Sequence, residues 1–389
     1  MKKLAIITTH PIQYHAPLYE LLTSRGHLSL KVFYTWGESV LKDKYDPGFG
    51  KVVVWDIPLL QGYDYTFLEN ISTDKGSHHF NGIINPDIIS TVQAYQPDAV
   101  LVYGWSFSSH LKLMRAFKGR VPVLFRGDST LLDEAGGFSR LKRRLFLRWV
   151  YRYIDYALYV GKNNADYFLK AGLKKRQLVF GPHAIDNDRF ACDDDQCLQQ
   201  ASSFRNQLGI PGDHAVFLFA GKFEPKKAPD LLLTAFIEAA MGDSVHLVLA
   251  GNGQMEDELK AMSSGNRSVH FLGFQNQAMM PALYRMADIF VLPSRGPGET
   301  WGLAVNEAMA CGLPVVVSDK CGCAPDLVKE GLNGYIFRSM DKDALKTRLR
   351  EMIDKRNEWT KMGSKSREII QEYSLERLAE SIEHLVDRC

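Results

Sequence analysis

Residues 288–314 read Asp288-Ile-Phe-Val-Leu-Pro-Ser-Arg-Gly-Pro-Gly-Glu-Thr-Trp-Gly-Leu-Ala-Val-Asn-Glu-Ala-Met-Ala-Cys-Gly-Leu-Pro314. The apolar run at the start predicts a buried strand, and the residues after Gly302 predict a helix that stops at Gly312. A strand, a loop and a helix in this order form part of a βαβ unit. This stretch therefore favours an α/β fold with a parallel sheet.

Two carboxylates flank the start of the expected helix. Glu299 comes just before it, and Glu307 lies about two turns further along the chain. Gly302 lets a ligand approach the backbone closely, and the first amides of a helix form a natural anion site. An anion site between two carboxylates that can bind hydroxyl groups fits a sugar nucleotide.

A second charged segment runs from Phe219 to Phe236 and predicts a strand, a turn and a helix. Lys222 and Lys227 lie in the turn. Their ammonium groups can reach a diphosphate that is held at a neighbouring helix start. With Glu299 and Glu307 they complete a pocket that carries both signs of charge.

Short apolar runs alternate with helical patterns along the whole chain, which predicts two doubly wound parallel sheets. We expect an N-terminal domain over 1–190, a linker over 191–213 and a C-terminal domain over 214–372. Residues 373–389 form an amphipathic pattern and are expected to pack back on the first domain. The expected strands are Lys3–Thr8, Leu30–Tyr34, Ala99–Tyr103, Val121–Phe125, Tyr156–Val160, Gln177–Phe180, Ala215–Ala220, His246–Ala250, Val269–Leu272, Ile289–Leu292, Pro314–Ser318 and Gly334–Phe337.

The composition is that of an ordinary globular protein, with 46% hydrophobic and 24% charged residues among 389. No apolar run reaches the roughly 18 residues of a membrane span, and the apolar part of the N-terminus is too short for a signal peptide. We therefore expect a cytoplasmic protein. The six cysteines have no zinc-site spacing, and the Asp193-Asp-Asp195 run follows no strand, so we expect neither a metal nor a cofactor.

The charge is unevenly distributed. Residues 1–190 hold 25 Lys and Arg against 17 Asp and Glu, a balance of +8, and the remainder holds 22 against 28, a balance of −6. Residues 138–153 carry six basic residues and no acid, interleaved with large apolar ones that include Phe146, Trp149 and Tyr153. Such a helix can lie on an anionic membrane, or its apolar face can pack on the sheet. Because the basic residues gather on one helix without a known motif, nucleic acid is not expected as a partner.

The chain resembles the retaining glycosyltransferase family 4 over nearly its whole length. This resemblance implies the GT-B fold, in which two Rossmann-like domains face each other. The matching segments, in order, are 181–190, 221–236, Ala250-Gly-Asn-Gly253, Phe271-Leu-Gly-Phe274, Tyr284–Ser294, Glu299–Pro314 and Gly331-Leu-Asn-Gly-Tyr335.

The resemblance also implies roles for individual residues of the donor site. Glu307 would bind the ribose hydroxyls, and Glu299 would meet the sugar hydroxyls near the anomeric carbon. The amides near Gly302 and Leu303 would hold the distal phosphate. The lysines at 222 and 227 would neutralise the departing diphosphate, Phe274 would lie beside the base, and Trp301 is also placed in the donor site.

Two segments depart from the family pattern. Thr9-His-Pro-Ile-Gln-Tyr14 stands where the family has a Gly-Gly loop, so His10, Gln13 and Tyr14 are assigned to the acceptor side. Arg126-Gly-Asp-Ser129 stands where many members present His-Asp. Asp128 or Arg126 would then substitute for the missing histidine, which makes Asp128 and His10 catalytic candidates beside Glu299.

The predicted function is that of a metal-independent, retaining hexosyltransferase. It would move a sugar from a nucleoside diphosphate, with UDP or GDP favoured, to a hydroxyl of a glycan or lipid-linked glycan, as in bacterial surface polysaccharide synthesis. Two alternatives stay open. The chain could be a GT-B epimerase that acts on a sugar nucleotide without an acceptor, or a noncatalytic protein that binds sugar nucleotides or glycans.

Overall fold

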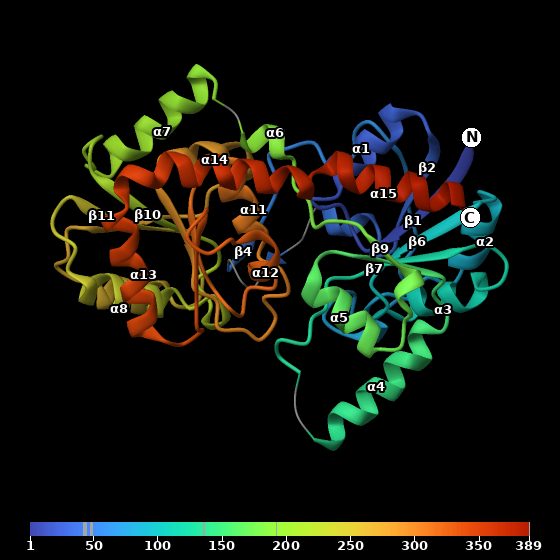
Figure 1. Ribbon diagram of the computed structural model, residues 1–389. Coiled ribbons are helices and arrows are strands. Elements are labelled where there is room, and N and C mark those ends of the chain that lie inside the picture. The colour runs from blue at the N-terminus through green and yellow to red at the C-terminus, as the bar shows by residue number, and fades with distance from the viewer. Residues whose placement is uncertain (42–44, 47–49, 135–136, 192, 389) are drawn as a thin grey trace. The chain divides into compact units, whose positions relative to one another are not determined.

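The computed structural model describes residues 1–41, 45–46, 50–134, 137–191 and 193–388. The chain divides into two compact units (Figure 1). Unit 1 comprises Met1–Lys44, Ile57–His183 and Leu375–Cys389, and unit 2 comprises Tyr45–Asp56 and Ala184–Ser374. Each unit has its own parallel sheet, as expected for the GT-B fold.

Unit 1 is built on a seven-stranded sheet in the order β5-β2-β1-β6-β7-β8-β9, with every pair parallel. The six strands expected from apolar runs all form; β1, β2, β6 and β7 are mostly buried, whereas β8 is partly buried and β9, at the edge of the sheet, has only half-buried residues. The strands are β1 (Lys2–Thr8), β2 (Leu28–Tyr34), β5 (Asp64–Phe67), β6 (Ala99–Tyr103), β7 (Val123–Arg126), β8 (Tyr156–Tyr159) and β9 (Leu178–Phe180).

Strand β5 was not predicted from the sequence. It reads Asp-Tyr-Thr-Phe, lies at the edge of the sheet beside β2 and has no fully buried residue. An edge strand that is only partly covered needs no continuous apolar run, so it leaves little signal in the sequence.

The helices of unit 1 include the C-terminal helix α15. This helix contacts α1, β1 and β9, and the guanidinium of Arg25 on α1 donates two hydrogen bonds of 2.9 Å to the carboxylate of Glu383 on α15. The helices are α1 (Ala16–Arg25), α2 (Ile88–Ala94), α3 (Ser108–Phe117), α4 (Phe138–Tyr151), α5 (Lys162–Lys170) and α15 (Leu375–Arg388), with short 3-10 turns η1 (Glu38–Leu41), η2 (Phe80–Gly82) and η3 (Lys175–Gln177).

Unit 2 is built on a six-stranded parallel sheet in the order β12-β11-β10-β13-β14-β15. All six strands expected in this part of the chain form. They are β10 (Ala215–Ala220), β11 (Val245–Ala250), β12 (Val269–Leu272), β13 (Ile289–Leu292), β14 (Val315–Ser318) and β15 (Gly334–Phe337), and a short antiparallel pair, β3 (Tyr45–Asp46) and β4 (Lys51–Val52), belongs to the same unit.

Helices cover the sheet of unit 2 and connect its strands. Gly251 follows β11 and approaches the backbone so closely that a Cβ there would lie 2.0 Å from the carbonyl oxygen of Gly221. The helices are α6 (Asn187–Phe190), α7 (Asp195–Gln207), α8 (Pro229–Ala239), α9 (Glu256–Met262), α10 (Met280–Arg285), α11 (Leu303–Ala310), α12 (Ala324–Leu327), α13 (Lys342–Asp354) and α14 (Trp359–Ile370), with 3-10 turns η4 (Pro225–Lys227), η5 (Gln277–Met279), η6 (Arg356–Glu358) and η7 (Gln371–Tyr373).

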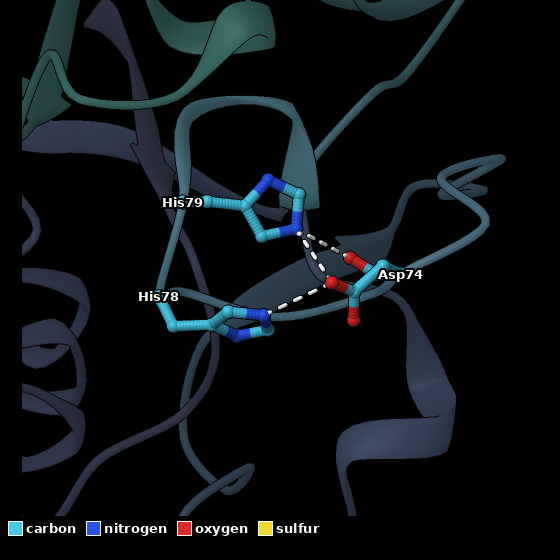
Figure 2. A group of neighbouring side chains, drawn as sticks. All are labelled: Asp74, His78 and His79. Atoms are coloured by element: carbon cyan, nitrogen blue, oxygen red, sulfur yellow. Dashed lines mark hydrogen bonds and ion pairs between the residues drawn. The ribbon is translucent and has the colours of Figure 1, made fainter.

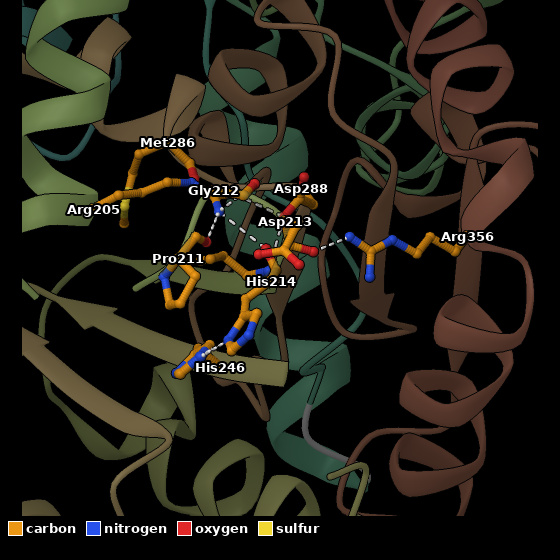
Figure 3. Close-up of polar contacts among 10 residues, drawn as sticks. Arg205, Pro211, Gly212, Asp213, His214, His246, Met286, Asp288 and Arg356 are labelled. Atoms are coloured by element: carbon orange, nitrogen blue, oxygen red, sulfur yellow. Dashed lines mark hydrogen bonds and ion pairs between the residues drawn. The ribbon is translucent and has the colours of Figure 1, made fainter. Parts of the chain in front are cut away.

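Residues 191–213, expected to be a linker, are part of unit 2 where the structure describes them. Asp194 caps α7 by accepting the amide of Cys197 at 2.7 Å, and α7 packs against α10. Arg205 on α7 donates to the carboxylate of Asp288 at 3.0 Å and to the carbonyls of Met286 and His214 (Figure 3). These bonds attach the segment to the sheet, which a polar composition by itself does not reveal.

Each sheet has one point at which the strand order reverses. In unit 1 it lies between β1 and β6, and in unit 2 between β10 and β13. Ligands of open α/β sheets bind outside the carboxyl ends of the strands at such a point. We therefore expect ligands to bind near the residues that follow β1 and β6 in unit 1 and β10 and β13 in unit 2, and we call these two places the switch points of the sheets.

Candidate functional site

The central feature of unit 2 is a buried ion pair at its switch point. Lys227 lies in η4 after β10, and Glu299 lies in the loop after β13. The Lys227 Nζ is 2.6 Å from the Glu299 Oε2, and the Ser294 hydroxyl donates to the same oxygen at 2.9 Å. The structure thus brings together two charges that are separated in the sequence by three strands and three helices, α8 to β13.

The environment keeps Lys227 charged. Burial alone would lower the pKa of its ammonium, but the adjacent Glu299 carboxylate outweighs that effect and the pKa is raised. Both side chains are largely shielded, with 17% of Lys227 and 7% of Glu299 exposed. Removing either partner would leave the other charge buried and uncompensated. The Lys227 ammonium and the Glu299 carboxylate therefore depend on each other for their charged state and position.

Helix α11 begins beside this pair. Gly302, the residue before its first turn, has φ of +101°, and a Cβ there would lie 3.0 Å from the Leu292 Cδ2 and 3.7 Å from the Glu299 Oε1. Glycine is required because a side chain would be strained and crowded. Leu303 and Ala304, the first helical residues, are partly exposed, so their end of the helix can meet a ligand.

Glu307 is buried one turn further along α11. Its Oε2 accepts a hydrogen bond of 2.7 Å from the hydroxyl of Tyr284 on α10, and only 3% of the residue is exposed. A buried carboxylate held by a hydroxyl has a defined orientation. Tyr284 was part of a matched segment, but the sequence did not identify it as the residue that positions Glu307.

Trp301, expected in the donor site, immediately precedes Gly302 at the start of α11. Its indole is buried, its Nε1 donates to the Asn306 Oδ1 at 2.8 Å, and its ring centroid lies 5.8 Å from that of Tyr373. Because the single polar hydrogen of the indole is already used, Trp301 is placed to position the start of α11 rather than to hydrogen-bond a donor.

Phe274 and Lys222 both follow strands of the same sheet and are half-buried. The Phe274 amide donates to the Asn252 Oδ1 at 2.8 Å, and its ring centroid lies 6.4 Å from that of Trp55. Trp55 belongs to the segment Tyr45–Asp56, which the sequence had assigned to the first domain. The Asn276 side chain ties this segment down by donating to the Val54 carbonyl at 2.8 Å.

Cys321 lies close to the ion pair, in an environment that disfavours its thiolate. Burial, followed by the charge of Glu299, raises the pKa of its thiol to about 12. A thiol with that pKa stays protonated at neutral pH and reacts poorly.

In unit 1 the predicted acceptor-side residues follow β1 and β7. His10 comes after β1, where its Nδ1 lies 2.9 Å from the Thr9 hydroxyl and its ring meets Trp36 edge-on at 5.2 Å. Gln13 and Tyr14 are half-buried in the loop before α1. All three predicted residues therefore lie at the carboxyl end of the central strand.

Arg126, at the end of β7, is buried and anchors the backbone. Its Nη1 and Nη2 donate to the carbonyls of Gly181 and Pro182, each at 2.7 Å. Burial lowers the pKa of the guanidinium, and the nearby Tyr103 and Asp128 act in the opposite direction. The buried Arg126 therefore places a positive charge at the carboxyl end of β7, in the sheet of unit 1.

From the sequence, no ligand role was assigned to the two histidines near Arg126, and His183 was interpreted as structural. Burial, followed by the charge of Arg126, lowers the pKa of His183 to about 3, so the imidazole is neutral where its Nε2 approaches the Asp128 Oδ2 at 3.9 Å. The Nδ1 of the half-buried His15 is itself buried and has no hydrogen-bond partner among the described residues, and burial lowers the pKa of this imidazole well below its usual value. A buried polar atom without a protein partner at a switch point can be satisfied by a ligand or by water.

None of the helices in the described ranges has the length and hydrophobicity that a bilayer crossing requires.

Comparisons with known proteins show which proteins the chain is similar to in sequence and in fold. Residues 200–369 match the family model described as glycosyl transferases group 1. A D-inositol 3-phosphate glycosyltransferase of Geodermatophilus obscurus is 31% identical over 48% of this chain and 42% of its own length. A GDP-mannose-dependent alpha-(1-6)-phosphatidylinositol monomannoside mannosyltransferase of Mycolicibacterium smegmatis is 29% identical over 58% of this chain and 60% of its own length. The chain thus spans about half the length of these curated relatives.

Solved structures resemble the whole chain in fold. HepE of Anabaena in complex with UDP has a TM-score of 0.75 at 19% identity and covers 100% of both chains. WaaG, a glycosyltransferase of lipopolysaccharide biosynthesis, has a TM-score of 0.66 at 16% identity and covers 98% of this chain and 99% of its own. The two parallel-sheet units and these neighbours identify the GT-B fold. The family-model match agrees with the resemblance to glycosyltransferase family 4 over residues 200–369, which is the part of the chain that the model covers.

Proposed function

We propose that the chain transfers a sugar from a nucleoside diphosphate to an acceptor hydroxyl, with the donor bound in unit 2. The observation that carries the proposal is the buried ion pair of Lys227 and Glu299 at the switch point, next to the start of α11. A charged lysine and helix amides suit a diphosphate, and a carboxylate suits sugar hydroxyls.

The transfer step explains why such a site accelerates the reaction. When the anomeric C–O bond breaks, its electron pair goes to the diphosphate oxygen, where negative charge develops. Lys227, Lys222 and the amides of Leu303 and Ala304 stabilise that charge more in the transition state than in the ground state. We propose that the transfer is metal-independent on this ground. We also propose that the acceptor attacks from the face that the diphosphate leaves, so that the anomeric configuration is retained.

The remaining donor contacts follow from the same site. Glu307, oriented by Tyr284, would accept hydrogen bonds from the ribose hydroxyls, and Phe274 with Trp55 would form an aromatic wall beside the base. UDP or GDP is favoured because HepE of Anabaena was solved with UDP and the mannosyltransferase of Mycolicibacterium smegmatis is GDP-mannose-dependent.

Unit 1 is proposed to bind the acceptor, a glycan or lipid-linked glycan. His10 and Asp128 lie at the carboxyl ends of β1 and β7, where they can meet an acceptor hydroxyl and its proton. Gln13, Tyr14 and the buried Arg126 complete this side. A role in surface polysaccharide synthesis is proposed from the acceptor class.

The proposal is tested with the full chain and a panel of UDP, GDP, ADP and CDP sugars. One donor should raise the thermal stability, by about 2.7 kcal/mol when its concentration is 100 times its Kd. The same donor with an acceptor should release nucleoside diphosphate. If donor alone yields an isomeric sugar nucleotide, the chain is an epimerase. Binding without any nucleoside diphosphate release would identify a noncatalytic binding protein.

We also propose that helix α4 binds an anionic membrane surface. One face is buried in unit 1 through Leu147 and Val150. A second apolar face stays exposed, and its positions repeat at helical spacing. Its members, with their exposed fractions, are Leu141 (53%), Leu145 (57%), Phe146 (44%) and Trp149 (38%).

Exposed cations accompany this face. Lys142 lies on it, three, four and seven residues before Leu145, Phe146 and Trp149, and further exposed cations of the helix are Arg140, Arg143 and Arg148. Figure 1 shows the N-terminal end of α4 projecting beyond the other helices of unit 1. An exposed apolar face with basic flanks is typical of a helix that lies in the headgroup region.

The double variant Leu141→Ser, Leu145→Ser should lose vesicle binding. Moving both side chains out of the lipid should cost at least about 1.4 kcal/mol, or tenfold in the partition coefficient. Co-sedimentation with phosphatidylglycerol-containing vesicles measures it, and neutral phosphatidylcholine vesicles should bind weakly at every salt concentration. Leu332→Ser, which changes an equally exposed leucine of unit 2, is the matched control. Equal binding by the double variant and this control would refute the membrane role.

A further inference from the structure

Three potential metal ligands converge in the loop that follows β5 in unit 1. They are the carboxylate of Asp74 and the Nε2 atoms of His78 and His79 (Figure 2). Their ligand atoms all lie within 4.8 Å of one another, and each histidine Nε2 is 3.2 Å from the Asp74 Oδ2. Neither histidine was assigned a role by the sequence analysis.

Two of these separations, the 3.2 Å from each histidine Nε2 to the Asp74 Oδ2, match the edges of a zinc coordination sphere. A tetrahedral zinc ion with bonds of about 2.0–2.1 Å holds neighbouring ligand atoms about 3.3 Å apart. The two imidazoles are adjacent in sequence, yet their rings turn to the same carboxylate, with centroids 4.6 Å apart and planes at 65°. The His78 Nε2 hydrogen-bonds the Asp74 carboxylate, whereas the His79 Nε2 hydrogen-bonds the Asp74 backbone carbonyl at 3.0 Å and lies near the carboxylate. A metal bound at these nitrogens would displace the hydrogens of both bonds.

We propose that Asp74, His78 and His79 bind one zinc ion. Imidazole and carboxylate ligands suit zinc among the divalent metals that cells supply. Three protein ligands leave a fourth position open for water or for an oxygen of another molecule.

The loop that carries these ligands has a defined internal structure. Asn70 is buried and organises it, because its Oδ1 accepts the amides of Ser72 and Ile84 and its Nδ2 donates to the Gly82 carbonyl at 2.9 Å. The Ser72 hydroxyl donates to the carbonyl oxygens of Asp74 and Asn81. These bonds tie the segment between 70 and 84 to its own ends, so the ligands start from a prearranged geometry.

Two glycines make room for the histidines. A Cβ on Gly76 would lie 2.4 Å from the His78 Nδ1, and a Cβ on Gly82 would lie 2.1 Å from the Gly76 carbonyl oxygen. The amide of Gly76 donates to the carbonyl of Gly82 at 3.1 Å, which closes the loop. Larger residues at either position would push the ligands apart.

The zinc proposal and the transfer proposal rest on different residues. The zinc ligands follow the edge strand β5 in unit 1, whereas the donor site lies in unit 2. The transfer step proposed above uses no metal, so the expected role of the ion is to stabilise the loop between β5 and α2. Each proposal can therefore fail without the other.

The test uses the full chain after treatment with a chelator and exhaustive dialysis. Titration with Zn²⁺, followed by calorimetry and by metal analysis of the dialysed complex, should give one ion per chain. Co²⁺ serves as a second probe, because its visible absorption bands intensify in tetrahedral coordination. Substitutions of residues that only support metal ligands typically weaken metal affinity by roughly 10- to 100-fold. His78→Ala, His79→Ala and Asp74→Asn each remove a ligand, so each should weaken zinc affinity by more than that.

His27→Ala and His384→Ala remove exposed histidines elsewhere in unit 1 and are the matched controls. They should bind zinc like the unaltered chain. Without metal, the three ligand variants and the two control variants should all have the same thermal unfolding midpoint. Added zinc should raise that midpoint in the unaltered chain and in the two controls, but not in the ligand variants. Donor-induced stabilisation should persist in His78→Ala. The absence of saturable binding at micromolar Zn²⁺, or equal affinity in ligand variants and controls, would overturn the proposal.

Discussion

Replacing Lys227 by methionine should lower the rate of sugar transfer by about 100- to 1000-fold. Methionine keeps most of the side-chain volume but removes the ammonium that faces the developing charge of the diphosphate. The Glu299 carboxylate would also lose its partner at 2.6 Å. Release of nucleoside diphosphate from the preferred donor, with and without acceptor, measures the loss.

Lys226→Met is the matched control for this variant. Lys226 is the preceding residue in η4, its side chain is 39% exposed, and its Nζ lies 3.3 Å from the Glu224 carboxylate rather than from Glu299. We expect nearly unchanged transfer, since exposed ion pairs contribute little. If Lys226→Met and Lys227→Met had equal rates, the diphosphate would not be bound by this pair.

The double variant Lys227→Met, Glu299→Gln separates stability from catalysis. Lys227→Met alone should destabilise the protein by about 3–5 kcal/mol, because it leaves a buried carboxylate uncompensated. Neutralising Glu299 as well should restore much of that stability. Transfer should stay low in the double variant, which shows that the loss of activity is not caused by unfolding.

Glu307→Gln should abolish most of the thermal stabilisation by the preferred donor. The carboxylate is proposed to accept both ribose hydroxyls, and hydrogen bonds to a charged group contribute about 1.5–3 kcal/mol each. Loss of that charge predicts an affinity about 100- to 1000-fold weaker. Calorimetric titration with the nucleoside diphosphate measures it directly, without depending on turnover.

Two further variants serve as comparisons for Glu307→Gln. Glu258→Gln changes an exposed carboxylate on α9 and should leave donor affinity unchanged. Tyr284→Phe removes the hydroxyl that donates to Glu307 at 2.7 Å and should weaken binding less than Glu307→Gln does, because the carboxylate itself remains. Unchanged affinity in Glu307→Gln would count against the ribose contact.

All twelve strands that the apolar runs predicted are present. The two structural units, however, divide the chain at other positions than the domain boundaries expected from the sequence. Twelve apolar runs became the strands of two sheets because a buried strand needs apolar residues on both faces, which is a local property. The edge strand β5 lacks that pattern. The segment Tyr45–Asp56 and helix α7 belong to unit 2. Long-range hydrogen bonds hold them there, such as those from Asn276 to Val54 and from Arg205 to Asp288, and a local sequence pattern does not predict contacts between residues so far apart in the chain.

The sequence by itself determined which residues carry charge near glycine-containing turns, and this led to Lys222, Lys227, Glu299 and Glu307. Only the tertiary structure decided that Lys227 meets Glu299 and that Tyr284 holds Glu307, because strand order places β10 beside β13 across 72 residues of sequence (299 − 227). The histidines around Arg126 and the triad of Asp74, His78 and His79 likewise became visible only when folding brought their atoms together. The physical reason is that apolar patterning is read along the chain, whereas a polar site depends on distances across it.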